Sequence, residues 1–292
     1  MALNLSILKT RSLTAAVFVL VMLTGLLWNP WSFLILFSVI HFGCWIEYQK
    51  IMVLIDKDYA GASSLHRYSV MIAGWCFMLY LVNGNLRLAG ISLHNVGWWG
   101  CFGFLCLLAV GEIVQFKTLN IKNIGRSALG LLYISLPMAL LTWLRTKFYG
   151  SPLPLTDRVP VLMIIGSIWI NDTMAYIVGS LIGRTPLSAI SPKKTWEGTI
   201  GGIILAIGVM GGIGALIGPD WNPFSVGHWM AVAAICAVVG TFGDLLESKM
   251  KRMAGIKDSG HIMPGHGGFL DRFDSLLIAT PVACCYLMWV IG

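Results

Sequence analysis

The sequence predicts an all-α integral membrane protein, a polytopic bundle of about nine transmembrane helices with a cytoplasmic N-terminus. The first observation is composition: 57% of the 292 residues are hydrophobic and 11% are charged, whereas soluble domains carry about 25% charged residues. The second is that the apolar runs are long and lack the alternation of barrel strands. The third is the uneven distribution of Lys and Arg between the loops, which predicts the orientation.

Each predicted helix is an apolar segment long enough to cross the hydrocarbon core, which takes about 20 residues. The first segment follows Lys9 and Arg11 and has no small-residue cleavage site after it, so we expect a retained helix rather than a signal peptide. Asn29 and Pro30 join it tightly to the second segment. The nine segments cover residues 12–28, 32–48, 68–84, 95–112, 127–144, 159–182, 198–218, 228–247 and 270–291.

Positive charge lies mostly on one side of these segments. With a cytoplasmic N-terminus, sixteen of the 20 Lys and Arg residues face the cytoplasm, as the positive-inside rule favours. We therefore attribute the formal net charge of +7 mostly to topology, and expect part of it to attract anionic lipid headgroups. We expect no nucleic acid partner. The four residues on the other face are Arg87, Arg145, Lys147 and Arg158.

Acidic residues divide the chain into two regions. The spans of residues 1–158, an N-terminal transmembrane region of about five helices, hold acids only at helix ends, at Glu47 and Glu112. Residues 159–292, about four helices, carry ionisable side chains within the spans, where a charge is costly and usually faces a cavity or a partner. We therefore expect catalysis in residues 159–292, after a Gly- and Pro-containing linker from Tyr149 to Pro160.

The segment 198–218 is rich in glycine. Glycines four residues apart let helix backbones approach closely. We expect close packing inside the bundle, with a homodimer seam as the alternative. The pairs are Gly198 and Gly202, Gly208 and Gly212, and Gly214 and Gly218.

Asp172 lies eleven residues before Gly183, hence about 16 Å from the cytoplasmic end of its helix and near the membrane midplane. A structural ion pair would satisfy such a carboxylate; we favour a polar cavity reached from the cytoplasm. The next cytoplasmic loop carries Lys193 and Lys194. These are either ordinary positive-inside residues or contacts for phosphate oxygens.

The eighth segment ends with three polar residues, Asp244, Glu247 and Ser248, on one helix face. Pairing with Lys251 at i,i+4 explains Glu247 but not Asp244, one turn deeper. Carboxylates here suit Mg²⁺, which commonly bridges protein carboxylates to substrate phosphates. Nearby Lys and Arg would bind the remaining phosphate charge, a combination typical of phosphoryl or nucleotidyl transfer.

The last helix begins after Gly267 and Gly268, which places Asp271 and Asp274 near its start. A helix N-terminus presents unpaired N–H groups and partial positive charge, and adjacent glycines let an anion approach. N-terminal capping explains one aspartate well, but it explains two aspartates together with Arg272 poorly.

The spaced motif S-x-x-K-R-x4-K-D-x5-P-x-H-G-G-x-x-D-R-x-D resembles the signature of phosphatidate cytidylyltransferases (CDP-diacylglycerol synthases). The upstream sequences ND, ISPKKTWEG and GD..ES are also similar to that family, so the resemblance covers residues 170–275. The first five segments share only hydrophobicity with it. The motif is filled by Ser248, Lys251, Arg252, Lys257, Asp258, Pro264, His266, Gly267, Gly268, Asp271, Arg272 and Asp274.

The resemblance implies transfer of the cytidylyl group of CTP to phosphatidate, giving CDP-diacylglycerol and pyrophosphate for phospholipid synthesis. It also implies Mg²⁺, alone or beside a second metal ion, and a cell (inner) membrane enzyme with its active site facing the cytoplasm. The implied residues are Asp244, Asp271, Lys251 and Arg252 for catalysis; Asp244, Asp271 and Asp274 for metal; and Lys193, Lys194, Ser248, Lys257, His266, Gly267, Gly268, Arg272 and Asp172 for substrate binding.

Two alternatives remain open. A related CTP-dependent lipid enzyme, of the CDP-archaeol synthase or polyprenol kinase type, would use similar groups. An ion-coupled transporter would use Asp172 and Asp244 as relay carboxylates. Transporters often have paired repeats with broken helices, and the sequence shows no such repeat.

Overall fold

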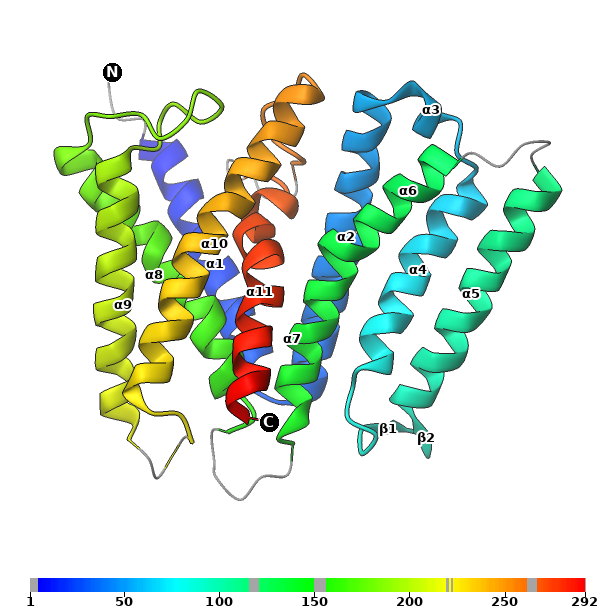
Figure 1. Cartoon of the computed structure of the whole chain (residues 1–292), viewed down its shortest axis with the longest axis horizontal. Coiled ribbons are helices and arrows are strands. Elements are labelled where there is room, and N and C mark those ends of the chain that lie inside the picture. Colours follow the sequence, from blue (N-terminus) through cyan, green and yellow to red (C-terminus); the bar gives the residue numbers. More distant parts are fainter. Residues whose placement is uncertain are drawn as a thin grey trace.

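The computed structural model describes residues 5–115, 121–149, 156–218, 221, 223–261 and 267–291. In these residues the regular structure is helical apart from one small hairpin, and the helices lie alongside one another between two ends of the molecule (Figure 1). The hairpin pairs β1 (Arg87–Leu88) with β2 (Ile91–Ser92). The helices are α1 (Leu5–Leu27), α2 (Pro30–Ile55), α3 (Lys57–Ala60), α4 (Ser64–Tyr80), α5 (Leu93–Gln115), α6 (Ile121–Gly130), α7 (Leu136–Lys147), α8 (Val159–Ile182), α9 (Trp196–Ile217), α10 (Val226–Met253) and α11 (Leu270–Ile291), with a π-helical turn, Leu131–Ser135, between α6 and α7.

Seven helical segments of the described chain are long and apolar enough to cross a membrane. Helices α1 and α4 overlap the expected segments 12–28 and 68–84, but the apolar part of α1 covers Thr14–Leu27, and α4 has 17 residues and ends at Tyr80. The chain is a multi-pass helical membrane protein; the count of nine spans and the orientation stay predictions. The seven segments are Pro30–Ile55, Leu93–Gly111, Ile121–Lys147, Val159–Ile182, Trp196–Ile217, Val226–Met253 and Leu270–Ile291.

A tight connection joins α1 to α2. Asn29 Oδ1 accepts the backbone N–H of Ser32 at 2.8 Å, and Ser32 Oγ accepts the N–H of Asn29 at 3.1 Å. Pro30 occupies the first turn of α2, where its missing N–H has no intrahelical partner to lose. This capping box confirms the close joint expected at Asn29 and Pro30, and it lays α1 against α2.

Glycines on α9 permit close helix packing. A Cβ on Gly202 would lie 2.7 Å from Ala175 Cβ of α8, and one on Gly214 would lie 2.6 Å from the Trp229 ring of α10. The expected packing inside the bundle is therefore confirmed at these positions. A Cβ on Gly208 would meet nothing within 4 Å, and a homodimer seam on that part of α9 stays a prediction.

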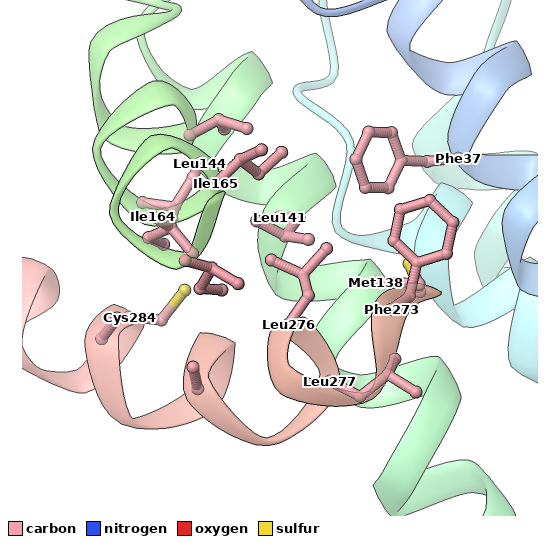
Figure 2. Close-up of a cluster of buried hydrophobic side chains, with 14 of the residues drawn as sticks. Phe37, Met138, Leu141, Leu144, Ile164, Ile165, Phe273, Leu276, Leu277 and Cys284 are labelled. Atoms are coloured by element: carbon pink, nitrogen blue, oxygen red, sulfur yellow. The ribbon is translucent and has the colours of Figure 1, made fainter. Parts of the chain in front are cut away.

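The core includes the junction of α7, α8 and α11 (Figure 2). Since lipid is as apolar as these side chains, van der Waals packing rather than exclusion of water holds the helices together. Helix α11 contacts α2 and α7 as well as α8 and α10, so the regions 1–158 and 159–292 share one core. Part of the expected linker, residues 150–155, lies outside the described residues. The core side chains include Met138, Leu141, Leu144, Ile164, Ile165, Leu276, Leu277 and Cys284.

Candidate active site

A cavity of about 1230 Å³ is lined by residues of α1, α8, α10 and α11 and of the loop between α8 and α9. Its lining combines apolar side chains, such as Phe18 of α1 and Trp169 of α8, with ionisable ones. The structure thus brings to one place most of the charged groups that the sequence singles out. The expected site residues that line the cavity are Asp172, Lys193, Lys194, Asp244, Lys251, Lys257, Gly267, Asp271, Arg272 and Asp274.

Three carboxylates on the cavity wall, Asp172, Asp244 and Asp274, form what we call the aspartate cluster. Asp244 forms an ion pair with Lys194, and its Oδ1 accepts the hydroxyl of Ser248 at 3.2 Å. The carboxyl groups of Asp172 and Asp274 are electrostatically coupled to each other and to the Asp244–Lys194 pair. Three carboxyl groups beside one lysine supply oxygen ligands of the kind that divalent cations prefer.

The close approach of α10 and α11 has a local cause. A Cβ on Gly243 of α10 would lie 2.6 Å from the carbonyl oxygen of Asp274 on α11, a distance that real side chains do not tolerate. Glycine at this position therefore lets the backbones meet and brings Asp244, the next residue, toward Asp274. Asp274 is only 9% exposed, and its Oδ1 accepts the N–H of Ser275 at 2.6 Å.

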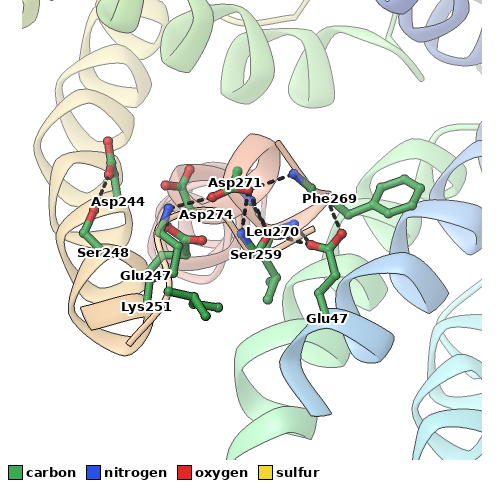
Figure 3. A network of polar contacts seen from close by, with 12 residues as sticks. Glu47, Asp244, Glu247, Ser248, Lys251, Ser259, Phe269, Leu270, Asp271 and Asp274 are labelled. Carbon is green, nitrogen blue, oxygen red and sulfur yellow. Dashed lines mark hydrogen bonds and ion pairs between the residues drawn. The ribbon is translucent and has the colours of Figure 1, made fainter. Parts of the chain in front are cut away.

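A second group of charges lies at the start of α11, and we call it the Asp271 network (Figure 3). Lys251 Nζ lies 2.6 Å from Asp271 Oδ1 and 2.5 Å from Glu247 Oε2. Asp271 Oδ2 accepts both the N–H and the hydroxyl of Ser259, each at 2.9 Å. The network also includes Glu47 of α2, which accepts the Ser259 hydroxyl at 2.6 Å. The expected Glu247–Lys251 pair is present, and Asp271 joins it.

The backbone N–H groups at the start of α11 are already bonded. Glu47 accepts the N–H of Phe269 and of Leu270, each at 2.9 Å. Asp271 Oδ2 accepts the N–H of Gly268 at 2.7 Å. The expectation that this helix N-terminus stabilises carboxylates is confirmed, because two carboxylates of the chain itself accept these N–H groups. The approach of a substrate anion at the adjacent glycines stays a prediction.

Glu47 and Ser259 are functional residues for which the sequence predicts no role. Glu47 interrupts an otherwise apolar stretch, FGCWIEYQ, and a buried carboxylate must find hydrogen-bond donors. That signal indicates a partner but does not identify it, since Ser259 lies 212 residues further along the chain.

The loop between α8 and α9 is held by Glu197. Its carboxylate accepts the N–H groups of Arg184 and Thr185, each at 3.2 Å. Backbone pairing across the loop places Lys193 and Lys194 at the cavity. Glu197 is thus bonded to the loop backbone rather than to these lysines, which leaves Lys193 exposed and Lys194 with Asp244.

Four expected site residues lie elsewhere. Ser248 and Gly268 touch cavity residues, Asp244 and Asp271, without lining the described cavity themselves. Arg252 is exposed at the end of α10, where its Nη1 donates to the carbonyl of Ile256 at 3.5 Å. His266, together with Pro264 of the motif, lies outside the described residues.

The carboxylates differ in how well they could bind a divalent cation. Among the described residues no group of three or more His, Cys, Asp or Glu forms a preformed metal site. Mg²⁺ is, however, usually held by one or two carboxylates together with substrate phosphates and water. Asp244 and Asp274 at the cavity fit that mode. Asp271 fits it poorly, because Lys251, Ser259 and Gly268 already use its oxygens.

The chain is similar in sequence to several known proteins. The chain is 36% identical over 201 residues to the phosphatidate cytidylyltransferase of Synechocystis, a match that covers 60% of this chain and 66% of that protein. It is 32% identical over 187 residues to the Rickettsia felis protein of the same name, covering 61% and 77%. With the chloroplastic phosphatidate cytidylyltransferase 4 of Arabidopsis thaliana it shares 41% over 129 residues, covering 44% and 32%.

The chain therefore spans about two thirds of the Synechocystis relative and about one third of the Arabidopsis relative. A family model extends the similarity beyond the segment 170–275 that the motif resemblance covers. The model of the cytidylyltransferase family matches residues 9–290, which include the N-terminal helices. The chain belongs to the cytidylyltransferase family.

Proposed function

We propose that the chain transfers the cytidylyl group of CTP to phosphatidate and releases CDP-diacylglycerol and pyrophosphate. The observation that carries the proposal is the composition of the cavity wall. Carboxylates and lysines suited to a metal ion and phosphates lie beside apolar side chains of α1 and α8 suited to a lipid. Relatives with the name phosphatidate cytidylyltransferase support the same assignment.

Lys193 and Lys194 are the proposed contacts for the phosphates of CTP. Both line the cavity, and as flexible point charges they suit phosphate oxygens. Lys194 is paired with Asp244 in this structure, so the nucleotide would exchange a carboxylate for a phosphate as its partner. The exchange keeps the ammonium group neutralised throughout.

Asp244 and Asp274 are the proposed holders of Mg²⁺, which when bound would neutralise charge on the two phosphates that react. Lys251, Glu247 and Asp271 have a different task, since they already satisfy one another. They fix the end of α10 against the start of α11, and so maintain the separation of the two proposed ligands.

Phosphatidate would enter from the membrane with its acyl chains beside Phe18, Val19 and Trp169. Its phosphate is ionised at neutral pH, so its oxygen attacks the α-phosphorus of CTP without a general base. The bond from the α-phosphorus to the bridging oxygen breaks, and pyrophosphate leaves with that electron pair. The products are CDP-diacylglycerol and pyrophosphate.

The proposed location is the cell (inner) membrane, with the cavity facing the cytoplasm. Helix α1 begins and α8 ends at one end of the bundle, whereas α11 ends at the other (Figure 1). The end with the α8–α9 loop carries Lys193 and Lys194, as the positive-inside rule favours for a cytoplasmic face. CTP is a soluble polyanion and would arrive from that side.

The test is pyrophosphate release by purified protein given CTP, Mg²⁺ and phosphatidate in detergent or vesicles. We expect release that depends on the lipid, together with one CDP-diacylglycerol per pyrophosphate. A polyprenol in place of phosphatidate separates the alternatives, because a kinase would yield CDP and a phosphorylated lipid. No lipid-dependent pyrophosphate from folded protein would overturn the proposal.

A further inference from the structure

The carboxylate of Glu47 joins the N-terminal helices to the start of α11. It is 5% exposed, lies on α2, and is bonded to residues more than two hundred positions away in the chain. Each of its oxygens accepts one backbone N–H, from Phe269 and from Leu270, at 2.9 Å. These N–H groups belong to the first turn of a helix and have no intrahelical partner, so α2 supplies the cap that α11 lacks.

The surfaces that meet here are shaped for this contact. A Cβ on Gly43, one turn before Glu47 on α2, would lie 2.0 Å from the ring of Phe269. A Cβ on Gly268 would lie 2.3 Å from Glu47 Oε1, and one on Gly260 would lie 2.2 Å from the same atom. The absence of side chains at these three glycines therefore leaves room for the Glu47 carboxylate and the Phe269 ring, and so lets α2 pack closely against the start of α11.

Ser259 connects Glu47 to the cavity. Its Oγ lies 2.6 Å from Glu47 Oε2 and 2.9 Å from Asp271 Oδ2. A hydroxyl has one proton, so the two carboxylates compete for it. Asp271 in turn binds Lys251 of α10 at 2.6 Å. A continuous chain of polar contacts thus runs from Glu47 of α2 through Ser259, in the segment between α10 and α11, to Asp271 of α11 and Lys251 of α10 (Figure 3).

We propose that Glu47 is a positioning residue for the reaction proposed above. It does not line the described cavity, and it acts by fixing the start of α11, and with it Asp271 and Asp274, relative to α10. The inference rests on the proposed function and deepens it. A carboxylate that only stabilised the fold would leave the turnover of folded protein unchanged.

The first test compares Glu47→Gln with wild type. Glutamine has the same size, but its amide nitrogen cannot accept the second backbone N–H. We expect kcat to fall about 10- to 100-fold, the range for a small displacement of catalytic groups. KM for CTP and for phosphatidate should change less than kcat, because Glu47 touches neither substrate. Glu47→Asp, which keeps the charge, should recover part of kcat.

Ser127→Ala is the matched control. Ser127 on α6 is buried and its Oγ lies 2.7 Å from Nε2 of His66 on α4, away from the cavity. Its loss should lower the thermal midpoint without lowering kcat of the folded fraction. Ser259→Ala gives the second comparison. Its effect on kcat should be less than additive with Glu47→Gln, because both act through Asp271.

Hydrogen exchange provides a readout that does not depend on activity. In Glu47→Gln the N–H groups of Phe269 and Leu270 should exchange faster, while α9 exchanges as in wild type. Unchanged exchange at these positions, or full kcat in folded Glu47→Gln, overturns the positioning role. A wild type that shows no lipid-dependent pyrophosphate release overturns the proposed function instead, and the catalytic part of this inference with it.

Discussion

The aspartate cluster and the Asp271 network contain the same kinds of side chain at neighbouring places, yet they differ in how many protein donors each carboxylate binds. Asp244 is 27% exposed and binds Ser248 and Lys194, and it shares Lys194 with two further acids. Asp271 is 11% exposed and binds Lys251, Gly268 and both the N–H and the hydroxyl of Ser259. A carboxylate with few protein donors can receive a substrate-bound cation, whereas one that binds several donors holds helices in place.

The largest effect is expected for Asp244→Asn. The change keeps the size of the side chain but removes the anionic oxygen that Mg²⁺ prefers. Loss of about 4 kcal/mol of transition-state stabilisation would slow turnover roughly a thousandfold. Pyrophosphate release across a Mg²⁺ titration measures it, and the variant should need more Mg²⁺. A normal rate with normal metal dependence would remove Asp244 from the metal site.

Asp271→Asn should behave differently, and this is the sharpest test of the comparison. The motif implies a metal ligand at Asp271, whereas its contacts indicate a structural ion pair with Lys251. Lys251 keeps Glu247 as a partner, so the change removes one of its two charged contacts and should cost about 1.5–3 kcal/mol of stability. We expect kcat to fall about a hundredfold by displacement of neighbouring groups, with an unchanged Mg²⁺ requirement. A raised requirement like that of Asp244→Asn would restore Asp271 as a ligand.

Local sequence patterns predicted the elements well and the contacts poorly. Segments 159–182 and 270–291 were located to the residue, because apolar length and the flanking glycines define them. The pair Glu247–Lys251 was also predicted, since i,i+4 spacing determines it. In contrast, periodicity carries no information about contacts between Glu47 and Leu270, which lie 223 residues apart.

The same limit applies inside the motif. Its spacing placed Asp271 and Asp274 on one helix, and the resemblance implied a metal ligand at Asp271 with Asp274 as an additional one. Their difference comes from what surrounds each carboxylate: Ser259 and Lys251 bind Asp271, while Gly243 brings α10 close to Asp274. Only the packing of separate segments decides which carboxylate keeps an open oxygen.

A smaller effect is expected for Lys194→Ala, measured against Lys193→Ala. Each lysine would lose a charged contact with CTP, and about 1.5 kcal/mol per contact corresponds to about a tenfold rise in KM for CTP. Lys194 also neutralises Asp244, so Lys194→Ala should tighten Mg²⁺ binding as well, and Lys193→Ala should not. Steady-state kinetics with varied CTP and varied Mg²⁺ distinguish these results. Identical behaviour of the two variants would argue against an active role for the Lys194–Asp244 pair.

The smallest effect is expected for Gly243→Ala, which separates the aspartate cluster without touching a charge. The added Cβ would lie 2.6 Å from the backbone oxygen of Asp274, and backbone cannot rotate away, so α10 and α11 must move apart. Such overpacking costs about 1–3 kcal/mol. Because Asp244 and Asp274 are the proposed metal ligands on the two helices, the Mg²⁺ requirement should rise a few fold.

Gly208→Ala is the control, since a Cβ there meets nothing within 4 Å. Thermal unfolding and the Mg²⁺ titration of this variant should both match wild type. If Gly243→Ala lowered stability but left the Mg²⁺ dependence unchanged, the two aspartates would not act on one ion. A destabilised Gly208→Ala would instead point to a homodimer seam on α9.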